Sequence, residues 1–180
     1  MPSHKSKTKT NIIKKTQRAK VQKNFKKIEK IGIDTDLINN ILENNYSFHG
    51  AIAQDNLVSI KHIKTPFSII VNTDTSNKPG KHWIAIYINK YRIEIFDSLG
   101  FNPNHWSKPP TYLIKFIQKY LYARRLTISK PIQFPFSNLC GLYCIYFILY
   151  RRYYTIRSSQ NLFTDNYATN DQILYNVFNQ

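Results

Sequence analysis

The 180-residue chain carries 26 Lys and Arg against 10 Asp and Glu, a formal net charge of +16. Hydrophobic residues make up 42% of it, enough for a core, so wholesale disorder is excluded. Two cysteines exclude a disulfide framework and a four-cysteine zinc site. The longest apolar run, Leu139 to Tyr150, is shorter than the roughly 20 residues of a membrane span, and no signal-peptide pattern opens the chain. The positive charge indicates an anionic partner or environment.

The charge is concentrated at the start of the chain. Residues 1–30 hold 11 Lys and Arg and one acid, a net charge of +10, whereas residues 31–180 carry +6. We expect residues 1–30 to form a basic, largely disordered arm, with helical character only toward its end, and residues 31–180 to form a single domain. A basic arm suits phosphate neutralisation, so nucleic acid is a predicted partner. The alternative is a solvated tail or a localisation signal.

The first half of the predicted domain contains a helix, a strand and a hairpin. Leu37, Ile38, Ile41 and Leu42 recur at helical spacing in a segment from Asp34 to Asn45, which Asp34 or Thr35 can cap. A short β-branched run follows at Phe67–Val71. Two runs with alternating apolar residues, Trp83–Asn89 and Tyr91–Asp97, predict a hairpin with its turn at Asn89–Lys90.

The second half predicts mainly helices. Thr111–Arg125 has an apolar face, Leu126–Phe134 is extended with Pro131 indicating an edge or an irregularity, and Cys140–Tyr150 is apolar all round, as a buried helix is. Asn170 or Asp171 can cap a short last helix. This mixture of helices and strands predicts an α+β fold.

Cys140 is a candidate nucleophile because it begins the predicted buried helix. The free N–H groups and the dipole of a helix N-terminus favour a thiolate, and Gly141 permits a close approach of backbone or substrate. Cys144 lies one turn further into the core and is the weaker candidate. The alternative is that both cysteines are small buried hydrophobic residues.

A catalytic thiol needs a base, and His82 is the best placed of the five histidines. His82 and Asp97 each lie seven residues from the predicted turn, so we expect them opposite each other at the open end of the hairpin. A carboxylate there holds the imidazole tautomer and stabilises imidazolium. The alternative is a surface histidine near an unrelated aspartate. Gln133, seven residues before Cys140, can donate its side-chain amide to an oxyanion together with the Cys140 N–H.

These motifs resemble the adenovirus-type cysteine proteases (adenain), within the wider clan of ubiquitin-like-protein (SUMO) proteases. The resemblance rests on His82-Trp83, Phe96-Asp97-Ser98-Leu99-Gly100, Gln133 and Cys140-Gly141-Leu142-Tyr143-Cys144, and it covers roughly residues 46–150. The Asp-Ser-Leu-Gly string is closer to the SUMO-protease branch. The family also includes proteases of virophages and polinton-type elements.

The resemblance implies a central mixed sheet with the nucleophile helix packed against it, a papain-like or adenain-like fold. It implies Cys140 as nucleophile, His82 as base and acid, Asp97 as orienting carboxylate and Gln133 as oxyanion donor, with Trp83 structural. It further implies cleavage of viral capsid and core precursor proteins during virion maturation, in the virion and the infected cell. We expect a chain that is not secreted and has no membrane span.

No cofactor or metal is expected for the chemistry, although adenain-type enzymes are stimulated by DNA and by an activating peptide. Adenain has a further Cys that links it to that peptide, and this chain has only Cys140 and Cys144. Two other functions remain open. One is deconjugation of ubiquitin-like proteins by the same residues. The other is a catalytically inactive, basic nucleic-acid-binding virion protein.

Overall fold

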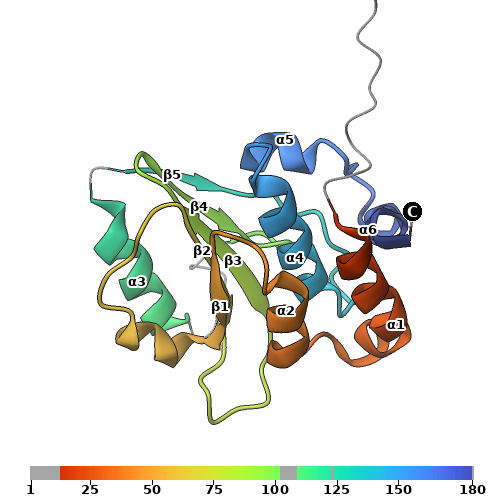
Figure 1. Cartoon of the computed structure of the whole chain (residues 1–180), viewed down its shortest axis with the longest axis horizontal. Coiled ribbons are helices and arrows are strands. Elements are labelled where there is room, and N and C mark those ends of the chain that lie inside the picture. The colour runs from red at the N-terminus through yellow and green to blue at the C-terminus, as the bar shows by residue number, and fades with distance from the viewer. Residues whose placement is uncertain (1–12, 102–108, 123, 180) are drawn as a thin grey trace, which may run out of the picture.

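A five-stranded mixed sheet forms the centre of the structure, a computed structural model that describes residues 13–101, 109–122 and 124–179 (Figure 1). Its strands follow chain order: β1 (Phe48–Ala53), β2 (Phe67–Asn72), β3 (Trp83–Ile88), β4 (Arg92–Phe96) and β5 (Arg125–Ile128). β2, β3 and β4 are antiparallel, whereas β1 and β5 each pair in parallel with their neighbour. The predicted mixed sheet and the α+β fold are confirmed.

Helices cover both faces of this sheet (Figure 1). The 3₁₀-helix η1 (Gln54–Ser59) and α3 (Thr111–Leu121) lie on one side. On the other side are α1 (Lys15–Ile31), α2 (Thr35–Leu42), α4 (Cys140–Arg151), α5 (Ile156–Gln160) and α6 (Tyr167–Asn179). The helix expected from Asp34 has Asp34 as its N-cap, whose carboxylate accepts from the Leu37 N–H at 2.8 Å.

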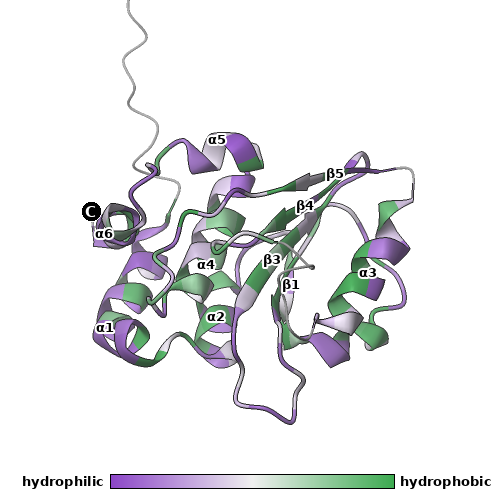
Figure 2. Cartoon of the chain, turned by 180° about the vertical axis from the view of Figure 1, so that it is seen from behind, coloured by the Kyte–Doolittle hydropathy of each residue, from purple (hydrophilic) through white to green (hydrophobic). Residues whose placement is uncertain are grey.

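Strand alternation divides the core into two apolar clusters. Ile84, Ile86 and Ile88 of β3 belong to the cluster under α3, whereas Ala85 and Tyr87 belong to the cluster under α4. Because successive side chains of a strand point to opposite faces, a strand covered on both sides is apolar throughout. The central strands and the inner faces of the helices are accordingly hydrophobic (Figure 2).

α4 is the central helix of the larger cluster. All nine residues from Gly141 to Leu149 are buried, which confirms the predicted buried helix. The ring of Phe147 stacks on Phe96 of β4 with centroids 4.7 Å apart. The start of α4 lies against β3, since the Cys144 thiol is 3.4 Å from the Trp83 carbonyl oxygen. The predicted nucleophile helix is therefore packed against the middle of the sheet, as expected.

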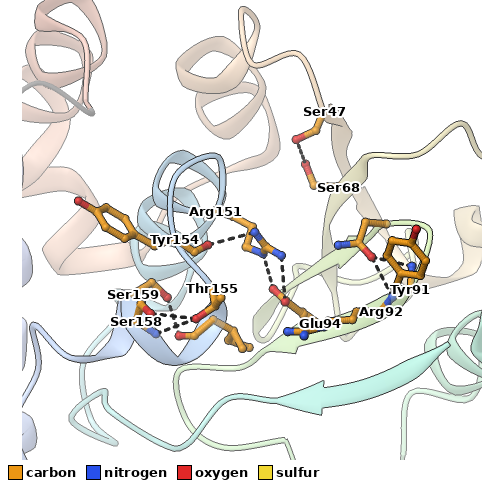
Figure 3. A network of polar contacts seen from close by, with 12 residues as sticks. Ser47, Ser68, Tyr91, Arg92, Glu94, Arg151, Tyr154, Thr155, Ser158 and Ser159 are labelled. Atoms are coloured by element: carbon orange, nitrogen blue, oxygen red, sulfur yellow. Dashed lines mark hydrogen bonds and ion pairs between the residues drawn. The ribbon is translucent and has the colours of Figure 1, made fainter.

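An ion pair connects the end of α4 to the sheet (Figure 3). The Arg151 guanidinium donates to both carboxylate oxygens of Glu94, with Nη2 3.0 Å from Oε1. Glu94 is fully buried, and the guanidinium also lies over the Tyr87 ring, 4.2 Å from its centroid. A bidentate geometry strengthens the hydrogen bonds between the two side chains and offsets part of the cost of burying them.

The hairpin turn lies one residue further along the chain than predicted. Ile88 pairs with Ile93, and the Asn89 N–H donates to the Arg92 carbonyl, so the turn has Lys90 and Tyr91 at its centre. The predicted two-residue turn at Asn89–Lys90 is therefore wrong. The Asn89 side chain accepts from the N–H groups of Tyr91 and Arg92, which stabilises the turn at this position.

The prediction of a largely disordered arm to residue 30 is wrong for residues 15–30. They form α1, on which Val21 and Ile28 are fully buried, and the helix packs against α2 and α6. The Gln17 amide donates to the Ile41 carbonyl at 3.2 Å. The narrow apolar stripe of α1 gains its stability by packing on the domain, which the basic composition obscures. Residues 1–12 of the predicted arm lie outside the described residues.

The last helix also begins earlier than predicted. α6 starts at Tyr167, and the Asn166 side chain accepts from the Thr169 N–H at 3.2 Å, so Asn166 takes the capping role expected of Asn170 or Asp171. Asn170 is instead buried, and its amide donates to the Ile132 carbonyl at 2.8 Å. Within the described ranges, no helix has both the length and the apolar character needed to cross a membrane.

Candidate active site

The four residues singled out in the sequence lie at the ends of three elements and in one loop. His82 directly precedes β3, Asp97 directly follows β4, Cys140 is the first residue of α4, and Gln133 lies between β5 and α4. His82, Gln133 and Cys140 line a cleft of about 760 Å³. Asp97 is buried and contacts His82. The structure therefore brings all four to one place.

His82 and Asp97 form the contact that the hairpin pattern predicts. His82 Nε2 and Asp97 Oδ1 are 2.7 Å apart, and Asp97 is 1% exposed. Oδ1 also accepts from the Leu99 N–H at 2.9 Å. The Ser129 hydroxyl accepts from the Asp97 N–H and donates to its carbonyl, at 2.9 and 2.8 Å. Backbone and carboxylate of Asp97 are thus both fixed, which orients the imidazole.

The protonation of His82 is decided by two opposing effects. Burial alone lowers the pKa of an imidazole, because it disfavours the charged form. Here the hydrogen bonds and negative charges of Asp97 and Cys140 outweigh burial and raise the pKa of His82 from 6.5 to about 10. Because Nε2 is bonded to Asp97, Nδ1 is the nitrogen that faces Cys140. The site therefore favours the protonated form of His82, which is held between Asp97 and Cys140.

The two cysteines differ in what surrounds them. Cys140 is partly exposed at the N-terminus of α4, where the first N–H groups of the helix have no partner within it. Cys144 is fully buried, and burial raises the pKa of its thiol well above the ordinary value. Only Cys140 combines access to the cleft with a partner for its proton, so it is the thiol suited to nucleophilic attack.

Gly141 lies where there is no room for a side chain. A Cβ atom at Gly141 would lie 2.1 Å from Ile33 Cγ2 and 3.0 Å from Trp83 Cδ1. The structure shows a close approach at this glycine, but the neighbours are two protein side chains and not the backbone or substrate expected from the sequence. Trp83, the residue after His82, is buried, and its indole N–H donates to the Ile33 carbonyl at 3.0 Å, in agreement with the structural role expected of it.

Gln133 lies in the cleft, but its amide is engaged by the protein. Its Nε2 is 2.8 Å from the Ser137 carbonyl oxygen and 3.1 Å from the Ser137 hydroxyl, and its Oε1 accepts from the Ser98 hydroxyl at 2.6 Å. Gln133 is 1% exposed. Its role as an oxyanion donor stays a prediction, which requires one of the two Ser137 contacts to be exchanged for the substrate.

Residues outside the predicted set also support the site. The Asn138 amide donates to the carbonyls of Glu29 and Lys30 at 3.3 and 3.0 Å, so the loop before Cys140 caps the C-terminus of α1. Ser129 holds Asp97, as described above. No sequence signal identified Asn138, because its partners lie in a segment that was expected to be disordered.

A thiol at a helix start, connected through a partly buried imidazole to a buried carboxylate, is the arrangement of papain-like cysteine peptidases. The sequence profile of the family described as adenovirus endoprotease matches residues 56–174. The chain therefore belongs to the adenovirus endoprotease family, a family of cysteine peptidases, which confirms the resemblance found in its motifs.

Individual relatives agree with the family. The chain is 27% identical over 103 residues to the cysteine protease S273R of African swine fever virus, an alignment that covers 49% of this chain and 36% of the relative. It is 31% identical over 88 residues to the protease of bovine adenovirus 4, covering 44% of each. The chain thus spans less than half the length of both relatives.

The crystal structure of the ASFV pS273R protease superposes with a TM-score of 0.48 at 15% identity, covering 99% of this chain and 92% of that one.

Proposed function

We propose that this protein is a cysteine endopeptidase that cleaves capsid and core precursor proteins of a virus during virion maturation. The observation that carries the proposal is His82, held between the buried Asp97 carboxylate and the Cys140 thiol at the edge of the cleft. Membership of the adenovirus endoprotease family supports the chemistry, and the viral relatives support the substrate class.

In the proposed reaction the Cys140 thiolate attacks the scissile carbonyl carbon and forms a C–S bond. The Gln133 amide and the Cys140 N–H stabilise the resulting oxyanion. The C–N bond then breaks, and protonated His82 gives its proton to the leaving amine. Water, deprotonated by His82, attacks the thioester and releases the acid and the free thiol. The residues present supply every proton transfer that this sequence of steps needs.

The matched pair of cysteines provides the test. Cys140→Ala is expected to lower cleavage of a co-encoded capsid precursor to background, because it removes the nucleophile. Cys144→Ala, which changes a fully buried thiol one helical turn away, is expected to retain most of the activity. Cleavage is measured by gel and by N-terminal mapping of the products. Full activity in Cys140→Ala would overturn the assignment.

The same assay distinguishes the two other functions that the sequence leaves open. Ubiquitin-like fusion proteins are offered beside the capsid precursors, and preferential cleavage of the fusions would indicate a deconjugating enzyme. An inactive nucleic-acid-binding protein would cleave neither, and a thiol-directed probe would fail to label Cys140.

We further propose that the protein binds nucleic acid and that DNA binding stimulates its peptidase activity. Seven of the cations among residues 1–30 lie on α1. Lys23, Lys26 and Lys30 are exposed and, at spacings of three and four residues, share one face of that helix. Such a face can contact successive phosphates and place the enzyme on packaged nucleoprotein, in the virion and the infected cell.

A further inference from the structure

Two adjacent residues at the end of β4 contact two different parts of the proposed catalytic machinery. Asp97 binds His82 through its carboxylate. Ser98, the next residue, is fully buried and donates its hydroxyl to Gln133 Oε1 at 2.6 Å. The Ser98 carbonyl also accepts from the N–H groups of Ile132 and Gln133 at 2.8 and 2.9 Å. Ser98 therefore holds both the backbone and the side chain of Gln133.

The direction of the Gln133 amide follows from its partners. A backbone carbonyl only accepts hydrogen bonds, so the atom that faces the Ser137 carbonyl must be the amide nitrogen. The oxygen of the same amide then faces Ser98, whose hydroxyl is free to donate to it. If the amide rotated by 180°, its oxygen would meet the Ser137 carbonyl and two acceptors would be opposed. The Ser98 hydroxyl adds a donor that favours the observed orientation.

We propose that Ser98 is the positioning residue that keeps the NH₂ group of Gln133 on the side of Ser137 in the cleft, from which it donates to the reacting carbonyl once the substrate replaces one Ser137 contact. The proposal rests on the function proposed above, in which Gln133 donates to the oxyanion. Asp97 and Ser98 then form one rigid unit, because the backbone that aims the base also aims the oxyanion donor. Preorganised donors of this kind stabilise a transition state without having to reorient during the reaction.

Peptide hydrolysis measures the effect of Ser98. Loss of an oxyanion donor lowers kcat by about 100- to 1000-fold, so Gln133→Ala is expected to lower kcat by that much. Ser98→Ala is expected to lower kcat by about 10-fold or more, with little effect on KM. In the Gln133→Ala background, Ser98→Ala is expected to cost little more, because the group that it orients is gone. Ser159→Ala is the control. Ser159 is also a buried serine, but it lies outside the cleft, and its hydroxyl donates to the Ile156 carbonyl.

Two thiol reagents separate positioning from a general structural effect. A peptide aldehyde forms a tetrahedral adduct with an oxygen in the oxyanion position, whereas iodoacetamide alkylates the thiol without one. Ser98→Ala is expected to weaken aldehyde binding by the same factor as kcat and to leave the rate and the pH profile of Cys140 alkylation unchanged. Slower alkylation together with a lower Tm would show that Ser98 only supports the fold, and would overturn the proposal.

The orientation of Gln133 is also measurable without turnover. Its side-chain NH₂ resonances are identified by their disappearance in Gln133→Ala. They are expected to exchange slowly with solvent in the unchanged protein and faster in Ser98→Ala. Equal protection in both proteins would overturn the proposal. A protein that cleaves no peptide but shows this difference would refute the proposed function and leave the positioning role of Ser98 standing.

Discussion

At the scale of single residues, the proton on His82 decides how the site responds to pH. Burial opposes the charged imidazole, but Asp97 and Cys140 raise its pKa to about 10. A folded-state pKa above the unfolded value of 6.5 means that the stabilisation is fully present below pH 6.5. It is lost as the pH rises through about 10. In the proposed mechanism, the imidazolium that protonates the leaving amine therefore persists over the neutral range.

The raised pKa of His82 predicts that activity extends to high pH and that a change at Asp97 shifts this limit. The alkaline limb of kcat/KM is expected near pH 10, where His82 loses its proton. Asp97→Asn removes one of the two groups that raise the pKa of His82, while burial still lowers that pKa. The alkaline limb of kcat/KM is therefore expected to move to lower pH, and the rate of hydrolysis is expected to fall. Peptide hydrolysis and iodoacetamide alkylation across the range from about pH 5 to about pH 11 measure both effects. Asp165→Asn, which removes a fully exposed carboxylate, is the control, and an unmoved limb in Asp97→Asn would contradict the prediction.

The sequence predicted the His82–Asp97 contact although it placed the turn incorrectly. The predicted turn set His82 directly opposite Asp97, whereas the observed register sets Ile84 opposite that position and shifts the pairing by two residues. Side chains alternate with a period of two, so a shift of two leaves both residues on the same face. A shift of one would have separated them. The contacts of Gln133 were not predictable, because Ser98 lies 35 positions away and is brought near by the sheet.

At the scale of elements, the start of α4 depends on the absence of a side chain at residue 141. Ile33, which follows α1, and Trp83, which begins β3, both occupy the space where a Cβ atom would lie. The helix can therefore approach the sheet closely enough to bring Cys140 to His82. Sequence patterns identified Gly141 as a point of close approach, but they did not identify Ile33 as the neighbour.

Gly141→Ala is expected to destabilise the protein, even though alanine favours helices. Overpacking of this kind costs about 1–3 kcal/mol, which exceeds the gain in helix propensity of at most about 1 kcal/mol. Urea unfolding measures the change in the free energy of unfolding. In an Ile33→Ala background the cost is expected to decrease, since the atom in conflict is removed. An equal cost in both backgrounds would show that the contact with Ile33 is not the cause.

α1 shows how composition can mislead at this scale. Its seven cations are typical of a solvated segment. However, Val21 and Ile28 lie two helical turns apart on an apolar stripe that α2 and α6 bury, and Ile13 is buried just before the helix. The stripe was visible in the sequence. What was not visible is that the rest of the domain offers a surface for it, including the Asn138 side chain that caps the end of the helix.

At the scale of the whole molecule, the packing of α1 decides where the +16 charge is available to a partner. Lys20 and Lys27 form ion pairs with Glu43 and Asp34, which lie directly beside α2, so part of the arm charge is used within the fold. Lys23, Lys26 and Lys30 are presented on a rigid helix whose C-terminus adjoins the loop before Cys140. A bound nucleic acid would thus lie close to the cleft.

Replacing these three lysines by glutamine is expected to weaken binding to a duplex of about 20 base pairs and to reduce its salt dependence. If each lysine contacts one phosphate, the slope of log K against log salt becomes shallower by about 2.7. Fluorescence anisotropy at several salt concentrations measures it. The control replaces three exposed lysines elsewhere, Lys61, Lys64 and Lys90, with the same change in net charge. An equal loss in both variants would show that only net charge matters.

The sequence by itself determined the alternating strands, the buried helix and the residue types of the site. These features follow from periodicity and from neighbours along the chain, which act over a few residues. Only the tertiary structure decided the register of the hairpin, the docking of α1 and the partners of Gln133. The last two depend on contacts between distant parts of the chain: Ser98 and Gln133 are 35 positions apart, and Asn138 and Lys30 are 108 positions apart. Such contacts form only when both layers of helices close on the sheet, because long-range packing selects among local possibilities that are similar in energy.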